Sequence, residues 1–445
     1  MKNHSEKMGS VSIRKLLLEQ SVPAGIGFLV MSIYSIVDIY FVSQYIGKVA
    51  IAAINIVLPI TFLISSIGMA IGIGGASIIS RALGADDRQK ALQTFGNQTV
   101  LTVGLAFTMV FLGSFFERPM LELFGANDEI LPEATKYLNV LLIGVPFLAW
   151  AMMSNNVIRA EGKPRVAMLT LLIPALVNIA LDPIFIAVWG WGIEGAAWAT
   201  TIGYCTSAIH TLIFYSGKKS ELKILRENLK LKMELVKETF SIGSITLARQ
   251  GSFSVLAIVL NNSLEAFGGS LALAVYGIIR SLTLFIAFPV IGILQGFMPI
   301  AGYNYGAQLL DRVKEAIYVS VRWSTVVSAL VFIIIFLGAD WVVSFFTDDP
   351  DLIAETPRAM RLTFIGVPVM GVSMISAGYF QALGKFKPAI FLTLTRQIIF
   401  LIPLIIILPM ALGLNGIWYA FPAGEFLAAV VCWFYLRAEV RRNLS

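Results

Sequence analysis

The chain has 445 residues, of which 57% are hydrophobic and only 13% are charged, and its mean hydropathy is +0.81. This composition excludes an ordinary water-soluble domain and indicates an integral membrane protein. The formal net charge is +6, and because the basic residues gather in a few loops it gives no reason to expect nucleic-acid binding.

Apolar runs of about 20 residues or more recur along the whole chain, and each could cross about 30 Å of hydrocarbon as a helix. Their continuity predicts helices, because the strands of a membrane barrel alternate over about ten residues. We therefore expect an all-α integral membrane protein with about twelve transmembrane helices. The predicted spans are 17–45, 50–80, 94–116, 133–158, 166–188, 194–216, 239–264, 271–300, 315–338, 357–383, 388–410 and 416–437.

Basic residues follow a one-sided pattern along these spans, which predicts that both termini are cytoplasmic. The opposite loops, 115–130 and 346–355, are acidic or nearly neutral. No signal peptide is evident, so the first span is expected to direct the chain to the cytoplasmic (inner) membrane. The basic positions are Lys2, Lys7, Arg14 and Lys15, followed by those in 81–90, 159–165, 217–238, 312–314, 385–387 and 437–442.

The chain contains an internal duplication. Residues 142–174 align without gaps on residues 364–396, at a constant offset of 222 residues. Because each half has an even number of spans, the halves are expected to be parallel repeats, related by a pseudo-two-fold axis along the membrane normal, with substrate bound in a cleft between two lobes. We predict an N-lobe over 1–216, a basic cytoplasmic linker over 217–238 and a C-lobe over 239–445. The linker is expected to be a solvated surface helix beside anionic headgroups.

Two acids interrupt the apolar spans of the first half only. Under the offset, Asp38 corresponds to Leu260 and Asp182 corresponds to Leu404. A lone carboxylate in hydrocarbon costs several kcal/mol, so acids absent from one repeat are better explained by function than by packing. A competing explanation is an acid near a helix end that reaches interfacial water. Such carboxylates can hold a proton, or Na⁺ with help from amide and hydroxyl oxygens, and the sequence leaves both open.

Other polar residues lie near these acids. Asn178 precedes Asp182 by four residues and shares its helical face. Asn155 and Thr200 interrupt neighbouring spans, and Pro23 is expected to bend the first helix. Each alone is equally compatible with contacts between helices, but together they outline a polar pocket.

The second half carries different charges, on basic residues. Arg280 and Arg396 lie well inside their spans and are expected to face the cleft or to pair across helices, whereas Arg249 could simply extend to the interface. Glu265 lies too near the outer surface to serve as a buried acid, so we expect the C-lobe to lack an acidic site.

The sequence resembles the multidrug and toxic compound extrusion (MATE) family, in its DNA-damage-inducible-F-like branch. The resemblance covers nearly all of residues 14–440. It rests on Pro23 with "SIVDIYFVSQYIG", and on "GIGGASIISRALGADDRQKA", "RAEGKPRVAM", "NIALDPIFI" and "GILQGFMPIAGYNYGA".

This resemblance implies a V-shaped bundle that exports organic, often cationic and amphipathic compounds in exchange for H⁺ or Na⁺. Asp38 and Asp182 match the family's cation-binding carboxylates, with Asn155, Asn178 and Thr200 as polar neighbours, and Pro23 matches the bending proline. If Na⁺ is the coupling ion, Asp38 and Asp182 are the expected metal ligands. The residues assigned to substrate binding are Tyr34, Tyr137, Arg280, Gln295 and Arg396.

Three other functions agree less well with the sequence than export does. A flippase for lipid-linked sugars, from the same superfamily, would need a strongly basic cleft, which the arginines of the second half partly support. A membrane enzyme is not expected, because no cluster of catalytic or metal-binding side chains appears. A channel is disfavoured by the different charges of the two halves. We expect no cofactor besides the coupling ion and no obligatory protein partner.

Overall fold

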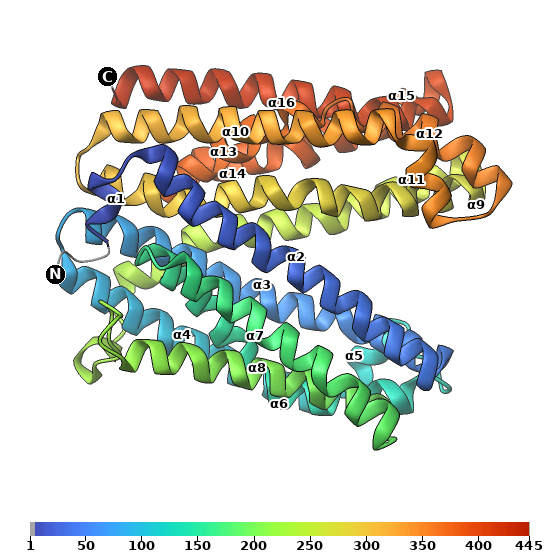
Figure 1. Cartoon of the computed structure of the whole chain (residues 1–445), viewed down its shortest axis with the longest axis horizontal. Helices are drawn as coiled ribbons and strands as arrows, with labels where there is room; N and C mark the ends of the chain where they lie inside the picture. Colours follow the sequence, from blue (N-terminus) through green and yellow to red (C-terminus); the bar gives the residue numbers. More distant parts are fainter. Residues whose placement is uncertain (1–4, 445) are drawn as a thin grey trace. The chain divides into compact units, whose positions relative to one another are not determined.

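The computed structural model describes residues 5–444, apart from the side chains of Ser35 and Leu284. Residues 1–4, which include the predicted basic residue Lys2, and residue 445 lie outside the described chain. The described residues form helices joined by short loops, without a strand among them (Figure 1). The predicted all-α fold is confirmed.

Each predicted span of the first half falls on a helix. The last of these ends before Gly217, and the fifth continues as a π-helical segment, η1. The elements are α1 (Lys7–Ser10), α2 (Ile13–Tyr45), α3 (Lys48–Gly84), α4 (Arg88–Phe115), α5 (Glu117–Leu123), α6 (Leu131–Ala160), α7 (Pro164–Asp182), η1 (Pro183–Val188), α8 (Gly192–Ser216) and η2 (Arg226–Leu229).

The second half repeats this order, with its first two spans joined in α9. The backbone of Gly269 breaks α9 with φ 62° and ψ −159°, a conformation that glycine adopts without a side-chain clash. The elements are α9 (Met233–Gly306), α10 (Leu310–Leu337), α11 (Ala339–Phe346), α12 (Pro350–Phe364), η3 (Val367–Val369), α13 (Met370–Ala382), α14 (Phe386–Leu394), η4 (Thr395–Leu401), α15 (Ile402–Leu412) and α16 (Leu414–Asn443).

Ten helical segments of the described chain are long and apolar enough to cross a membrane. One of these segments is the whole of α9, which contains two predicted spans, and α8 is not in the set. The chain thus forms a helix at each of the twelve predicted positions, and it is a multi-pass membrane protein.

The helices form two compact units. Of the described residues, the N-unit contains 5–7 and 26–246, and the C-unit contains 8–25 and 247–444. The chain passes between units inside two long helices, at Gly25 in α2 and at Thr246 in α9. These two points are equivalent, to within one residue, under the 222-residue offset. The opening turns of each repeat's first helix therefore belong to the other repeat's unit.

Close helix packing explains this exchange of opening turns. A Cβ atom on Gly74 of α3 would lie 2.1 Å from the backbone oxygen of Thr239 in α9. At the equivalent position, a Cβ atom on Gly296 would lie 2.4 Å from the Ser21 hydroxyl of α2. Small residues let helix backbones approach this closely inside a membrane. Within the N-unit, α3 also packs on α6, and α8 packs on both α6 and α7 (Figure 1).

The segment that follows α8 differs from the expected surface helix. Residues 217–232 contain only the short turn η2, and α9 begins at Met233. The segment is fastened to α4, because Gln93 Nε2 donates to the backbone oxygens of Asn228 (3.0 Å) and Lys230 (2.8 Å). The prediction of a helix over 217–238 was therefore wrong for its first part. Buried side chains of α4 satisfy the backbone groups that a helix would otherwise pair internally.

Candidate functional site

The two predicted acids meet inside the N-unit. Asp38 lies on α2 and Asp182 ends α7, with exposed fractions of 9% and 0%. Their side chains are within hydrogen-bonding reach of each other. Two carboxylates approach this closely only when a proton or another cation offsets their repulsion. The geometry therefore defines a paired carboxyl site.

Local backbone structure positions Asp182. The residue precedes Pro183, and the chain continues into the π-helical segment η1. Segments of this kind are rare and occur often at functional sites. Asn178, one turn before Asp182, donates from Nδ2 to Asp182 Oδ1 and to Thr200 Oγ1, both at 3.2 Å. Asn178 thereby links α7 to α8 beside the carboxyl pair.

Three buried oxygen atoms at this site have no hydrogen-bond donor among the described residues. They are Asp38 Oδ1, Asn178 Oδ1 and Asp182 Oδ2. Buried acceptors are normally paired, so a group of unpaired acceptors indicates a missing donor or cation. Carboxylate and amide oxygens are suitable ligands for a hard cation. The arrangement can therefore accept protons or hold one small cation.

Tyrosines surround the carboxyl pair. The charge of Asp38 acts on the buried side chain of Tyr137 on α6 and on the half-buried side chain of Tyr204 on α8. Tyr204 also shares a hydrogen bond with Tyr34 of α2. Sequence reasoning missed Tyr204, although it follows Thr200 by four residues and so shares its helical face.

Asn155 bonds elsewhere in the N-unit. Its Nδ2 donates to the backbone oxygen of Ala167 and to Thr170 Oγ1, both at 2.6 Å, and its Oδ1 accepts from Arg159 Nε at 3.0 Å. All side-chain hydrogen bonds that the structure gives Asn155 thus go to residues other than the two acids. Its predicted part in cation coupling stays a prediction.

Two other predicted residues lie in the C-unit. Pro23 is half-buried in α2, two residues before the point at which that helix enters the N-unit. Gln295 is half-buried in α9, next to the tightly packed Gly296. Neither residue belongs to the unit that holds the carboxyl pair.

The C-unit holds a different charged cluster. Arg396 lies in η4, and its Nε is 3.6 Å from Glu425 Oε1 of α16. Arg249 Nη2 donates to Gln381 Oε1 at 3.2 Å. Glu425 was missed by sequence reasoning, although an acid within the apolar run 416–437 was a visible signal. Glu425 is half-buried and lies beside Arg396, so the expectation that the C-lobe lacks an acidic cation site stays a prediction. Arg280 and Glu265 are exposed on α9.

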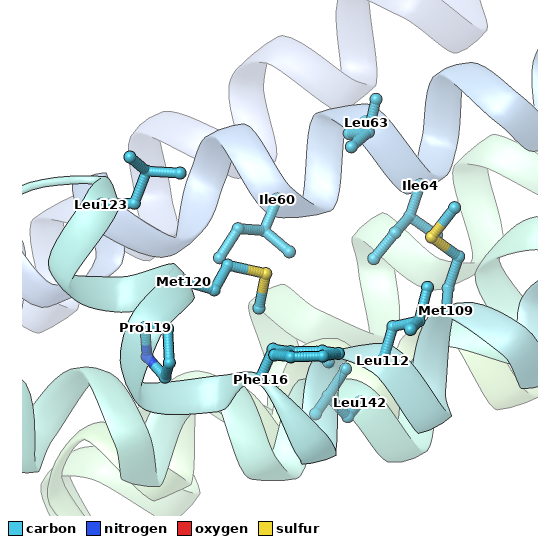
Figure 2. A pocket seen from close by; sticks show the side chains of 11 residues that line it. Ile60, Leu63, Ile64, Met109, Leu112, Phe116, Pro119, Met120, Leu123 and Leu142 are labelled. Atoms are coloured by element: carbon cyan, nitrogen blue, oxygen red, sulfur yellow. The ribbon is translucent and has the colours of Figure 1, made fainter.

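The N-unit also has a half-open apolar pocket of about 460 Å³, which Figure 2 shows from close by. Its wall combines α3, α4, α5 and α6, and its side chains present carbon and sulfur atoms. Among them are Ile60, Met109, Phe116, Met120 and Leu142. The described residues that line this pocket are apolar, so, unlike the carboxyl pair, the lining offers no side-chain ligand for an ion.

Two repeated units of membrane-spanning helices, with different charged residues inside each, are typical of transporters. A search with protein-family models supports this class. The MatE model matches residues 23–184 and 247–407, and these two segments follow the 222-residue offset to within about two residues. The chain therefore belongs to the MatE family.

Particular relatives resemble nearly the whole chain. The multidrug export protein MepA of Staphylococcus haemolyticus (strain JCSC1435) is 27% identical over 425 residues, which cover 95% of this chain and 93% of that protein. MepA of Staphylococcus aureus (strain MSSA476) is 27% identical over 418 residues, covering 94% and 92%. A crystal structure of a MATE transporter in complex with MaD3S superimposes with a TM-score of 0.93, at 24% identity over 99% of this chain and 98% of the other. The match confirms the two-lobed helical fold.

Proposed function

We propose that this protein exports organic, mainly cationic amphiphilic compounds in exchange for H⁺ or Na⁺, as a member of the DNA-damage-inducible-F-like branch. The observation that carries the proposal is the group of three unpaired buried oxygens on Asp38, Asn178 and Asp182. Family membership and the multidrug export names of the MepA relatives support the substrate class. The motifs around Pro23 and Asp182 support the branch.

In the proposed cycle, Asp38 and Asp182 take up H⁺ or Na⁺ from outside. Binding neutralises negative charge at a site where water is excluded and so changes which arrangement of α2 is most stable. Pro23 lies where α2 passes from one unit to the other, which makes it suited to transmit this change. The cation is released to the cytoplasm and substrate is loaded. By linkage, substrate must weaken cation binding by the same factor by which cation weakens substrate binding.

The proposed location is the cytoplasmic membrane, with both termini in the cytoplasm. The support is the bias of basic residues to one set of loops. Small organic compounds and the lipid bilayer are the proposed partners, without an obligatory protein partner or a cofactor other than the coupling ion.

The test is transport of a fluorescent organic cation by purified protein in liposomes with an imposed H⁺ or Na⁺ gradient. Asp38→Asn should abolish gradient-driven transport while the compound still binds, because an amide neither takes up protons nor adds negative charge for a cation. Glu265→Gln, which alters an exposed acid of the C-unit, is the matched control and should transport normally. Unimpaired coupled transport by Asp38→Asn would refute the proposal. Folded wild type that transports under neither gradient would favour a flippase.

A further inference from the structure

The charged cluster of the C-unit has an excess of positive charge. It comprises Arg249, Arg396 and Glu425, which sum to +1, and Arg249 lies within the electrostatic influence of Arg396. The hydrogen-bond partner of Arg249 is the neutral side chain of Gln381. Uncompensated charge in a membrane-spanning bundle is costly, so an excess positive charge calls for an anion.

The contact between Arg396 and Glu425 is also incomplete. Their closest nitrogen and oxygen atoms are 3.6 Å apart, which is longer than a hydrogen bond. Arg396 Nη1 and Glu425 Oε2 are buried and have no hydrogen-bond partner among the described residues. The side chains still keep exposed fractions of 20% and 17%. The pair is thus only partly exposed, and the donors of a guanidinium suit a carboxylate or phosphate, which would pair the unpaired Arg396 Nη1.

The duplication shows that the fold does not need this ion pair. Under the 222-residue offset, Arg396 and Glu425 correspond to Pro174 and Gly203 in the N-unit. There the same two helices pack backbone to backbone, and a Cβ atom on Gly203 would lie 2.9 Å from the Pro174 oxygen. Arg396 is moreover held in the π-helical segment η4. Because the N-unit packs these helices without charged residues, the charges of Arg396 and Glu425 are better explained by a ligand than by packing.

We propose that Arg396, supported by Arg249, binds an anionic group of the transported compound, and that Glu425 occupies Arg396 until this group displaces it. The inference rests on the proposed export function and extends its substrate class to amphiphiles that carry a carboxylate or phosphate. Glu425 then acts as a competitor within the protein. Removing its charge should favour the anionic ligand, whereas removing the charge of Arg396 should weaken it.

The test uses two fluorescent probes that differ in one group, tetramethylrhodamine with a free carboxylate and its methyl ester. Binding to the full-length purified protein is measured by fluorescence polarisation without any ion gradient. Arg396→Gln should weaken binding of the acid by about tenfold or more and leave the ester unchanged, since a hydrogen bond to a charged group has about that effect. Glu425→Gln should tighten binding of the acid. Arg396→Lys should restore part of the affinity.

Arg322→Gln, an exposed arginine on α10 of the same unit, is the matched control and should bind both probes as wild type does. Equal weakening of both probes by Arg396→Gln, or wild type that does not bind the acid, would overturn the inference. Nanodiscs with and without phosphatidylglycerol separate two sources of the anion: loss of acid binding with this lipid identifies a lipid phosphate, and retained binding identifies a soluble carboxylate. Gradient-driven transport of the ester tests the export function separately.

Discussion

The two units place different chemistry on the same helical frame. At the positions of Asp38 and Asp182 the C-unit has Leu260 and Leu404, which belong to one apolar core region. At the positions of Arg396 and Glu425 the N-unit has Pro174 and Gly203, which pack closely. Each unit thus shows how the other would be built without its charges. The comparison separates what the helices need for packing from what function has added.

The largest effect, a loss of transport, is expected when the two acids of the N-unit are replaced by the leucines that the C-unit has at the equivalent positions. A double variant, Asp38→Leu with Asp182→Leu, should lose gradient-driven transport to background. Its free energy of unfolding should stay the same or rise by about 1–4 kcal/mol, because replacing a buried polar pair with well-packed apolar side chains is often neutral or stabilising. Liposome transport and chemical unfolding in detergent measure the two quantities.

The single variant Asp182→Leu is the control for this double variant. It leaves Asp38 without its neighbour and should be less stable than the double variant. If the double variant were the least stable of the three proteins, the acids would be structural, and the comparison between units would no longer support a coupling role.

A second effect should distinguish the two close helix contacts, that of Gly74 with Thr239 in the N-unit and that of Gly296 with Ser21 in the C-unit. Gly74→Ala sets a Cβ atom against the backbone of Thr239, which cannot move away, and should cost about 3 kcal/mol of unfolding free energy. At Gly296→Ala the Cβ atom lies 2.4 Å from the Ser21 hydroxyl, which can rotate, and 2.9 Å from the Ser21 backbone nitrogen, a milder backbone contact than at Gly74, so the substitution should cost less. Gly104→Ala, where a Cβ atom meets nothing within 4 Å, is the control and should not destabilise. Equal losses at Gly74 and Gly296 would show that the two contacts are equally rigid.

The helices could be predicted from the sequence because each hydrophobic run is a local signal, and the internal repeat shows the same pattern twice. Sequence reasoning also identified Asp38, Asp182 and Asn178, since polar residues stand out in an apolar span. It missed Tyr204 and Glu425, whose roles depend on partners in distant spans. The prediction of a helix over residues 217–232 was wrong because Gln93 and Asn97 of α4 donate hydrogen bonds to the backbone of this segment. The sequence of the segment itself does not indicate these distant partners.

A third difference concerns the turns after α6 and α13. The N-unit turn contains Glu161, a fully buried acid, where the C-unit has Leu383. Burial raises the pKa of Glu161 to about 7, while hydrogen bonds from the Ser220 hydroxyl (2.8 Å) and the Glu221 backbone nitrogen (3.2 Å) partly oppose the shift. The folded protein therefore holds a proton more tightly than the unfolded chain does.

Because the folded-state pKa is raised, this contribution to stability is present below about pH 4.5 and is lost as the pH rises to about 7. Wild type should lose about 2 kcal/mol of unfolding free energy from this group between pH 5 and pH 8. Glu161→Gln should flatten that part of the profile, and Ser220→Ala should steepen it. Parallel profiles for wild type and Glu161→Gln would show that Glu161 does not titrate in this range.

The smallest difference is expected at α5 in the N-unit and at α11 and α12 in the C-unit, where each unit has an arginine ion pair. Arg361 of the C-unit bonds Asp340, donates to the backbone oxygen of Phe336 (3.1 Å) and lies over the Phe336 ring at 5.9 Å. In the N-unit, the one contact described for Arg118 is its ion pair with Glu122, which lies one helical turn further along α5. The Arg118 side chain is 70% exposed. Exposed pairs contribute little, whereas several interactions of one side chain add up.

Arg361→Ala should therefore lower the free energy of unfolding by about 1 kcal/mol, and Arg118→Ala should produce no measurable change. Thermal unfolding in detergent at low and at 0.5 M salt (roughly a 4 Å screening length) distinguishes the causes. Salt should remove the contribution of the Asp340 pair but leave that of the Phe336 contacts, so part of the Arg361 effect should persist. If Arg118→Ala destabilised as much as Arg361→Ala, α5 of the N-unit would depend on its ion pair as strongly as α12 of the C-unit does, and the difference between the units would be confined to the charges inside their helix bundles.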